Sequence, residues 1–464
     1  MHTIENVVGQ GMCVGCGACS VVTGGRVPVK IGRRGSYEAS LAAVQSADVR
    51  RASRVCPFSD ESRNEDEISQ PLYGKDQPHD PLLGHHQFTF AGRIADDGVL
   101  EGSSSGGMTS WTAAQLLARG LVDGVIHVGA ASPGQGELFT YQVSYNLADI
   151  QLKRKSAYYS TTMADALAQI RGDGRSYAVI GVPCFIRAAR LVGEEDPVLG
   201  KQLKYHLGLV CGHLKSQWFA ESMAWQAGVK PDALESVDFR VKAKHRSSND
   251  YDFGAKGTDD SYLSTKPTQA LVGGNWGHGM FQLNACNYCD DIFAETADVV
   301  FGDAWLPEYK SDSRGTNVVI SRNENLNTIF AEGQAQGILR LDELPADRVA
   351  ASQAGNFRHR RIGLAVRLAD DIREGKSVPL KRIAPGIEGV SARRLDLIRL
   401  RRKMSEKSLQ SFESAKMENN INVFLKTMLP LVRKYRNVEF GGAHKRILTD
   451  YKSRLKWALA SLRR

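Results

Sequence analysis

The chain has 464 residues, of which 42% are hydrophobic and 24% are charged, and its formal net charge is +9. A chain of this length can bury one large core or two moderate ones. No stretch reaches the roughly 18 uninterrupted apolar residues of a membrane-spanning helix, and residues 1–12 lack the basic and apolar regions of a signal peptide. We therefore expect a soluble cytoplasmic protein, which argues against a secreted disulfide framework for its eight cysteines.

Residues 1–60 contain four cysteines with a characteristic spacing. Cys13, Cys16 and Cys19 are separated by two residues each, and a fourth, Cys56, is followed by Pro57. This is the C-x2-C-x2-C run of bacterial ferredoxins, in which thiolates bind an iron–sulfur cluster. Because the fourth cysteine comes from a separate loop, we predict a ferredoxin-like 4Fe-4S module over residues 1–60.

A zinc ion is the alternative for this first set, because zinc also accepts four cysteine ligands. Zinc ligands usually come as two C-x2-C pairs, whereas here three cysteines follow one another at that spacing. The spacing therefore favours a cluster over zinc.

Residues 61–90 contain three prolines among polar residues and are predicted to be a linker. From residue 91 to about 350, apolar runs typical of strands alternate with stretches of helical periodicity. The predicted strands cover residues 88–94, 122–128, 176–180, 203–210, 298–301 and 317–321, and the predicted helices cover 108–119, 164–171, 185–191 and 218–227. This alternation predicts a mixed α/β core over residues 91–350.

The segment from Gly102 to Gly107 consists only of glycine and serine and precedes a predicted helix. Small residues at a helix N-terminus expose backbone N–H groups that can bind an anion, such as the pyrophosphate of a flavin. An ordinary serine N-cap on a flexible turn is the alternative. The segment also matches the G-x-S-x-G motif of hydrolases, with Ser104 in the key place, but that motif requires a sharp strand–turn–helix.

The second four cysteines are scattered along the core. Cys184 and Cys211 each follow an apolar run typical of a buried strand, and Cys286 and Cys289 form a C-x2-C pair. Two strand ends and one loop could bring the four thiols around a metal centre. Their spacing alone leaves open that they are buried, inert cysteines.

Residues 351–464 are predicted to be a helical C-terminal region, with basic helices over residues 392–418 and 422–436. From residue 391 onward there are 19 Lys and Arg against 6 Asp and Glu, whereas the first 390 residues are slightly acidic overall. Apolar residues are interleaved with these charges: Leu397, Leu400, Phe424, Leu425, Met428, Leu431, Val432, Trp457 and Leu462.

This basic tail has two readings. Its helices could simply be solvated and cover the core, or they could dock on an anionic membrane surface or on an acidic protein partner such as ferredoxin. The second reading would place the protein at the inner face of the membrane as a peripheral protein. No nucleic-acid recognition motif is present, so we expect no nucleic-acid partner. We also expect the cofactors to stay bound when residues 391–464 are removed.

Taken in order, these segments resemble the family of beta subunits of coenzyme F420 hydrogenase and dehydrogenase, which also includes plant 7-hydroxymethyl chlorophyll a reductase. The likeness extends from Met12 to about Arg361. It depends on Ser103–Gly107, Gly181–Cys184 with Arg190, Gly208–Cys211, Cys286 with Cys289 and Asp291, Ala297–Val299, and Gly302 with Asp303. Two positions depart from the family: Ala157 stands where many relatives have lysine, and Phe185 where many have glutamine.

The resemblance implies FAD and a 4Fe-4S cluster held by Cys184, Cys211, Cys286 and Cys289, beside the cluster of the N-terminal module. The residues that would contact FAD by the same correspondence are Ser103, Ser104, Ser105, Gly106, Gly107, Thr109, Ser156, Tyr158, Thr161, Asn317 and Arg322. The motifs also contain three candidate catalytic proton donors, His213, Tyr158 and Asp303, each of which could instead be structural.

These cofactors predict an FAD-dependent iron–sulfur oxidoreductase that passes electrons through two clusters and FAD. Our first expectation is the reduction of a small organic substrate with electrons from ferredoxin. The second is an electron-input subunit that oxidises the reduced deazaflavin coenzyme F420 for a partner enzyme. The third is a non-enzymatic redox-sensing or scaffold protein whose clusters are structural.

Overall fold

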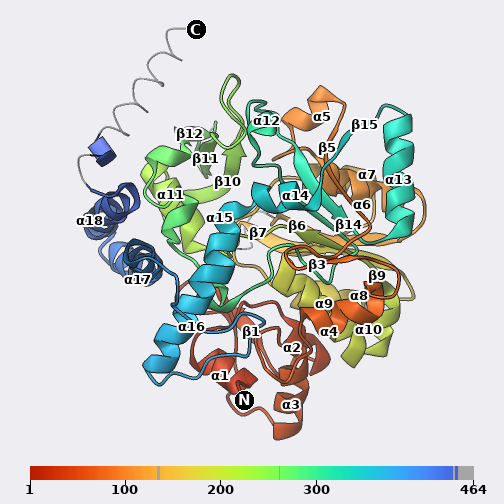
Figure 1. Cartoon of the computed structure of the whole chain (residues 1–464), viewed down its shortest axis with the longest axis horizontal. Helices are drawn as coiled ribbons and strands as arrows, with labels where there is room; N and C mark the ends of the chain where they lie inside the picture. The colour runs from red at the N-terminus through yellow and green to blue at the C-terminus, as the bar shows by residue number, and fades with distance from the viewer. Residues whose placement is uncertain (133–135, 261, 443–444, 448–464) are drawn as a thin grey trace.

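A computed structural model describes residues 1–132, 136–260, 262–442 and 445–447. At its centre is an eight-stranded sheet with the order β15-β5-β14-β13-β9-β8-β6-β7 (Figure 1). Its strands are β5 (Phe88–Ile94), β6 (Gly124–Ala130), β7 (Phe139–Ser144), β8 (Tyr177–Gly181), β9 (Leu203–Leu209), β13 (Val299–Asp303), β14 (Asn317–Ser321) and β15 (Leu339–Glu343). The mixed α/β core predicted from the sequence is confirmed, although β7 and β15 were not predicted.

The direction of the strands gives the sheet one chemically distinct edge. The four strands β6, β8, β9 and β13 are parallel to one another. Strand β14 is antiparallel to both β13 and β5, so β5 also points the same way as β13. The carboxyl ends of five strands therefore share one edge, which we call the carboxyl edge.

Helices cover both faces of the sheet (Figure 1). One face packs against α6 (Met108–Ala118), α7 (Leu147–Leu152) and α13 (Glu324–Ala335). The other packs against α8 (Ala164–Ile170), α9 (Pro183–Glu195) and α10 (Pro197–Gln202). Strand β8 is buried on both sides: Tyr177 and Val179 join one hydrophobic cluster, and Ala178 and Ile180 join the other. Burial of this kind is typical of parallel strands and explains the apolar run in the sequence.

The N-terminal module contains α1 (Ile4–Gly9), α2 (Ala18–Val22), the hairpin of β1 (Val29–Ile31) and β2 (Tyr37–Ala39), and α3 (Ser46–Val55). It packs on α9 of the core. Arg187 of α9, which is buried, donates to Pro57 O at 2.9 Å and to the Glu65 carboxylate at 3.1 Å. The module is therefore held to the core by buried polar contacts as well as by apolar packing.

Residues 61–90, predicted as a linker, form α4 (Glu65–Tyr73) and the short hairpin of β3 (His79–Asp80) and β4 (Gly84–His85). Ile68 and Leu83 of this segment are buried in the same cluster as α9. Beyond the main sheet, the chain adds a three-stranded sheet and several short helices. These are α5 (Asp97–Glu101), α11 (Trp218–Ala227), β10 (Leu234–Val241), β11 (Asp252–Gly257), β12 (Ser264–Pro267), α12 (Pro307–Lys310), α14 (Ala346–Ser352), α15 (Ala354–Phe357) and α16 (Gly363–Arg373).

The C-terminal tail forms two long helices, α17 (Ala392–Met417) and α18 (Ile421–Phe440), which pack together beside α11 and α16 (Figure 1). The interleaved apolar residues Leu397, Leu400, Phe424 and Met428 are buried. Leu425, Leu431 and Val432 are partly buried against the same cluster, and Trp457 and Leu462 lie outside the described residues. None of the described helices has the length and apolarity needed to cross a membrane.

The tail therefore covers the core, as one of our two readings proposed. Phe412 of α17 and Phe424 of α18 pack on the fully buried Phe281 of the core. Ser408 accepts a hydrogen bond from Phe281 N at 2.7 Å. Removal of residues 391–464 would expose this aromatic cluster to water and so cost stability, while the expectation that the cofactors stay bound without this segment stays a prediction.

We predict that Phe412→Ala lowers the free energy of unfolding by about 3–5 kcal/mol, because it leaves a cavity in a buried aromatic cluster. Urea unfolding followed by circular dichroism measures the change. The control is Leu429→Ala on the exposed side of α18, which should cost less than about 0.5 kcal/mol. Equal, small losses for the two variants would show that the tail is not part of the core.

Candidate functional site

The carboxyl edge gathers residues that lie far apart in the sequence. Cys184 follows β8 in the first turn of α9, and Cys211 follows β9. Asp303 ends β13 and pairs with Asn317, the first residue of the antiparallel β14. In open α/β sheets, ligands bind outside the carboxyl ends of the strands. The edge that holds these four side chains is therefore the candidate site.

The second cysteine set comes together at this edge. Burial raises the pKa of the Cys184 thiol, and Cys289, Cys211 and Cys286 raise it further because their charges would repel its own. Cys211 N donates to Ile292 O at 3.2 Å, which ties the end of β9 to the loop after Cys289. The four thiols therefore lie close enough to act on one another electrostatically, a grouping that their spacing in the sequence left open.

Buried cations surround this second set. Lys215 and Arg360 are each 1% exposed. Lys215 Nζ donates to Met280 O, and Arg401 Nη2 lies 3.1 Å from His213 Nδ1. Throughout the described ranges, none of these three cations forms an ion pair with a carboxylate. Burying a charge without a counter-charge costs free energy. An anion bound beside these cations would lower that cost.

The first cysteine set lines a cavity within the N-terminal module. All four thiols face it, together with apolar side chains that include Ile4, Val7 and Phe58. Gly15 N and Ala39 N donate to Cys13 Sγ, both at 3.4 Å. The loop between the cysteines is tightly packed. A Cβ at Gly17, whose φ is +89°, would lie 2.6 Å from Ala164 N.

Within the described residues, no group of three or more His, Cys, Asp or Glu side chains is placed so that it could hold a metal ion. A 4Fe-4S cluster differs from a single ion in this respect, since it offers each thiolate a different iron atom.

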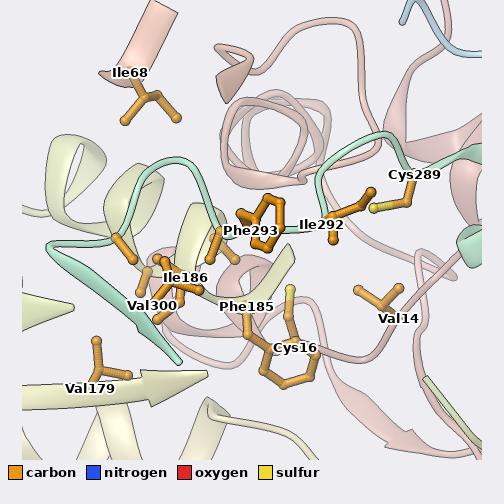
Figure 2. Packing of buried hydrophobic residues seen from close by; sticks show 14 of the residues in the cluster. Val14, Cys16, Ile68, Val179, Phe185, Ile186, Cys289, Ile292, Phe293 and Val300 are labelled. Atoms are coloured by element: carbon orange, nitrogen blue, oxygen red, sulfur yellow. The ribbon is translucent and has the colours of Figure 1, made fainter. Parts of the chain in front are cut away.

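The two cysteine sets are neighbours. Cys16 of the first set and Cys289 of the second belong to one buried hydrophobic cluster with Phe185 (Figure 2). Cys56 and Cys184 pack against that cluster. Burial raises the pKa of the Tyr141 phenol, and Cys184 and Cys16 raise it further. The Tyr141 ring stacks on Phe185 with their centroids 5.7 Å apart. Phe185, where many relatives have glutamine, thus forms part of an apolar wall beside both sets.

The glycine–serine loop joins the other predicted segments at the carboxyl edge. Ser156 N donates to Ser104 Oγ at 2.8 Å, and Met108 N donates to Asn317 Oδ1 at 3.2 Å. The structure thus brings the loop from Ser103 to Thr109 together with Ser156 and Asn317. Helix α5 lies between β5 and this loop, so Ser104 does not stand on the strand–turn–helix that a hydrolase nucleophile requires.

A polar pocket opens beside Ser104. It is lined by Ser104, Arg240, Lys242, Ala243, Ser247, Ser248, Asp250, Tyr251 and Ser313. Arg240, at the end of β10, is buried and donates to the Asp303 carboxylate at 3.0–3.2 Å. Its Nε is buried without a hydrogen-bond partner. Burial lowers the pKa of Lys242 to about 8, and its Nζ donates to Leu100 O and Arg314 O, both at 2.6 Å.

Sequence reasoning missed Arg240 and Lys242. The only signal was alternation in Phe239-Arg240-Val241-Lys242, which places the two cations on one face of a strand. Many exposed strands show the same alternation, so the pattern does not indicate a binding site without the fold.

Two of the three candidate catalytic residues pack on Trp276. Tyr158 packs against this indole with a centroid distance of 4.8 Å, and His213 stacks on it at 4.6 Å. Asp303 forms an ion pair with Arg240, and both charges act on the pKa of Tyr158. Burial lowers the pKa of His213 well below its ordinary value, and Lys215 lowers it further. His213 is therefore neutral near pH 7 and lies toward the second cysteine set.

Two predicted contacts lie elsewhere. Thr161 is buried between Ser160, whose Oγ accepts a hydrogen bond from Tyr37 N, and Met163, whose N–H donates to Cys16 O at 3.1 Å. This stretch therefore adjoins the first cysteine set. Arg322 follows β14 at the opposite edge of the sheet, where its guanidinium donates to four backbone carbonyls, those of Leu83, His85, Ala294 and Ala297. The structure does not bring Arg322 to the glycine–serine loop.

Comparison with known proteins gives consistent matches. Residues 89–168 match the N-terminal part, and residues 174–347 the C-terminal part, of the family described as the beta subunits of coenzyme F420 hydrogenase/dehydrogenase. A relative from Methanosarcina mazei, one of the subunits of its F(420)H(2) dehydrogenase, is 23% identical over 329 residues, which cover 69% of this chain and 82% of that protein. A chain of the F420-reducing [NiFe] hydrogenase complex from Methanosarcina barkeri aligns with a TM-score of 0.49 and 18% identity, covering 65% of this chain and 98% of that chain.

The packing of Gly106 gives a prediction. A Cβ there would lie 2.8 Å from both Asn317 Oδ1 and Gly92 O, so at this position the loop packs directly on β14 and β5. We predict that Gly106→Ala separates the loop from β14 and lowers the hydrogen-exchange protection of amides 103–108 about tenfold, the effect of ~1.4 kcal/mol. Gly355→Ala is the control, because its nearest neighbour is the end of the Arg358 side chain at 3.8 Å. Unchanged exchange in Gly106→Ala would contradict this packing.

Proposed function

This chain belongs to the family of coenzyme F420 hydrogenase/dehydrogenase beta subunits, and on that premise we propose that it is an electron-input subunit that oxidises reduced coenzyme F420 for a partner enzyme. The observation that carries the proposal is the gathering of eight cysteines into two adjacent sets of four, neither of which forms disulfides. In this proposal each set holds a 4Fe-4S cluster, and FAD binds at the carboxyl edge.

The first set suits a cluster because its surroundings are apolar and contain directed N–H donors. Backbone N–H groups that point at sulfur, together with burial, are the means by which proteins hold and tune such clusters. The donors from Gly15 and Ala39 meet this requirement at Cys13. Burial raises the pKa of Cys16 and Cys19, so thiolates here need a compensating positive charge, which iron would supply.

The second set suits a cluster for a complementary reason. Four thiolates around iron and sulfide carry a net negative charge. Lys215 and Arg360, buried cations without a carboxylate partner among the described residues, act on Cys286. Asp290 beside Cys289 is already paired with Lys381 and Arg382. Leu214 N also donates to Cys286 Sγ at 3.2 Å. An anionic centre at this place would remove the cost of burying Lys215 and Arg360.

The polar pocket beside Ser104 supports the proposed FAD site. Arg240 is fixed by Asp303 but keeps a buried Nε without a partner, and a cofactor oxygen or ring nitrogen would satisfy it. Bound FAD exchanges two electrons with a hydride carrier and single electrons with iron–sulfur clusters. Burial raises the pKa of Tyr158, so its phenol keeps its proton at neutral and mildly alkaline pH and can donate a hydrogen bond toward the pocket.

The family description favours the deazaflavin coenzyme over our first expectation, a ferredoxin-coupled reduction of an organic substrate. The names of the matched family and of the relative from Methanosarcina mazei refer to coenzyme F420. The described contacts around the pocket specify no particular organic substrate. Our third expectation, a non-enzymatic redox-sensing or scaffold protein, gives no reason for a polar pocket at the carboxyl edge.

We predict about eight irons and eight acid-labile sulfides per chain after anaerobic purification, because two 4Fe-4S clusters use all eight cysteines. Cys16→Ser and Cys286→Ser should each remove about half of the iron and leave the other half, so each variant is the control for the other. Chemical iron and sulfide analysis measures this. One zinc per set and no sulfide would refute the proposal.

We also predict that the anaerobic holoprotein oxidises reduced coenzyme F420 when a one-electron dye is the acceptor. The absorbance of oxidised F420 should return at a rate proportional to protein concentration. Arg240→Met should slow the reaction about tenfold or more, because a buried charged hydrogen-bond donor is lost. Reduction of organic compounds by reduced ferredoxin, without any F420 oxidation, would instead favour our first expectation.

A further inference from the structure

We propose that the buried guanidinium of Arg360 is a charge partner of the centre held by Cys184, Cys211, Cys286 and Cys289, and that it raises the reduction potential of that centre. The inference rests on the proposed function, because it assumes a 4Fe-4S cluster at the second cysteine set. Arg360 lies beyond residue 347, outside the segments that match the family.

The backbone directs Arg360 at the second set. The residue lies in a π-helical turn, Arg358–Ile362, between α15 and α16. Such turns are rare and often occur at functional sites. Arg360 Nη2 donates to Gly212 O at 2.9 Å and to Cys211 O at 3.2 Å, and it lies 3.8 Å from Cys211 Sγ. One end of the guanidinium is thus fixed against the loop that bears Cys211.

The rest of the guanidinium has no hydrogen-bond partner among the described residues. Arg360 Nε and Nη1 are both fully buried atoms there. Burial opposes the charged form, yet the pKa of Arg360 is raised because Cys289, Cys211, Cys286 and Cys184 all attract its charge. The charged group therefore lies within electrostatic range of all four cysteines of the second set and against Cys211 Sγ. Unsatisfied, charged N–H donors are costly to bury, and cluster sulfur is the acceptor that this place would offer.

The other buried cations nearby are engaged elsewhere. Arg401 lies against His213 and Gln282. Lys215 donates to Met280 O and lies 4.6 Å from the centroids of the Phe219 and Trp276 rings. Burial lowers the pKa of both, whereas that of Arg360 is raised. Arg360 is therefore the cation most closely tied to the cysteines.

The direction of the effect follows from charge. Reduction adds one negative charge to the centre, and a fixed positive charge in a dry interior stabilises the more negative state. Net charge and hydrogen bonds to sulfur are known controls of cluster potential. Removal of the guanidinium charge should therefore make the second centre harder to reduce, while the centre of the first set keeps its potential.

The test is a potentiometric titration of the anaerobic, full-length holoprotein, followed by electron paramagnetic resonance. In Arg360→Gln, the reduced-to-oxidised ratio of one centre at a fixed potential should fall about tenfold, or about 59 mV for one electron. The other centre is the internal reference. Arg399→Gln is the matched control, because it removes the same charge from an arginine of α17 that pairs with Asp370 at 2.8 Å.

Arg360→Lys separates charge from hydrogen bonding, since lysine keeps the charge but not the fork that holds the two carbonyls. A near wild-type potential in Arg360→Lys supports the inference, whether Arg360→Gln has a lowered potential or fails to bind its second cluster. Equal behaviour of the two variants, including failure of both to bind the cluster, overturns it and makes Arg360 a structural cap. Absence of the second cluster from the wild-type protein would instead refute the proposed function.

Discussion

Parallel pairing of β8 with β9, and of β9 with β13, brings Cys184, Cys211 and Asp303 to one edge of the sheet. Each of these strands ends where its run of apolar residues ends, and the residues that follow lie outside the sheet. The C-x2-C pair at Cys286 reaches the same edge from the loop before β13. A shift of β9 by one residue would turn Cys211 away from its partners, so the packing of this sheet determines whether the second set exists.

Buried arginines in this protein have two kinds of partner. At the junction with the N-terminal module, Arg187 pairs with Glu65, and Arg382 bridges Asp290 and Glu295. These are conventional buried ion pairs, which fix relative position more than they add stability. Arg360, beside the second cysteine set, has no carboxylate partner among the described residues and lies 3.8 Å from Cys211 Sγ. This contrast is the charge pattern on which the proposed anionic centre at the second set depends.

Much of the fold could be predicted from the sequence, because local pattern determines its elements. The helix at Trp218–Ala227 and the strand at Asn317–Ser321 have the predicted bounds, since periodicity and flanking polar residues mark them clearly. The spacing of the first four cysteines was likewise enough to predict that they form one set. The second set needed a family resemblance, because tertiary packing, not spacing, brings its thiols together. Arg240 and Arg360 could not be identified at all, since burial without a carboxylate partner is a property of the fold and leaves no mark on the sequence.

The shared hydrophobic cluster of Cys16, Phe185 and Cys289 has a further consequence. Many electron-transfer proteins control the flow of electrons by swinging a small carrier domain toward and away from its acceptor. Here the N-terminal module cannot swing without opening the protein interior, because it is packed into the same core as the second set. The distance over which electrons tunnel between the two proposed clusters is therefore set when the protein folds. A partner can therefore regulate electron transfer only where electrons enter or leave the protein, and not at the step between the two proposed clusters.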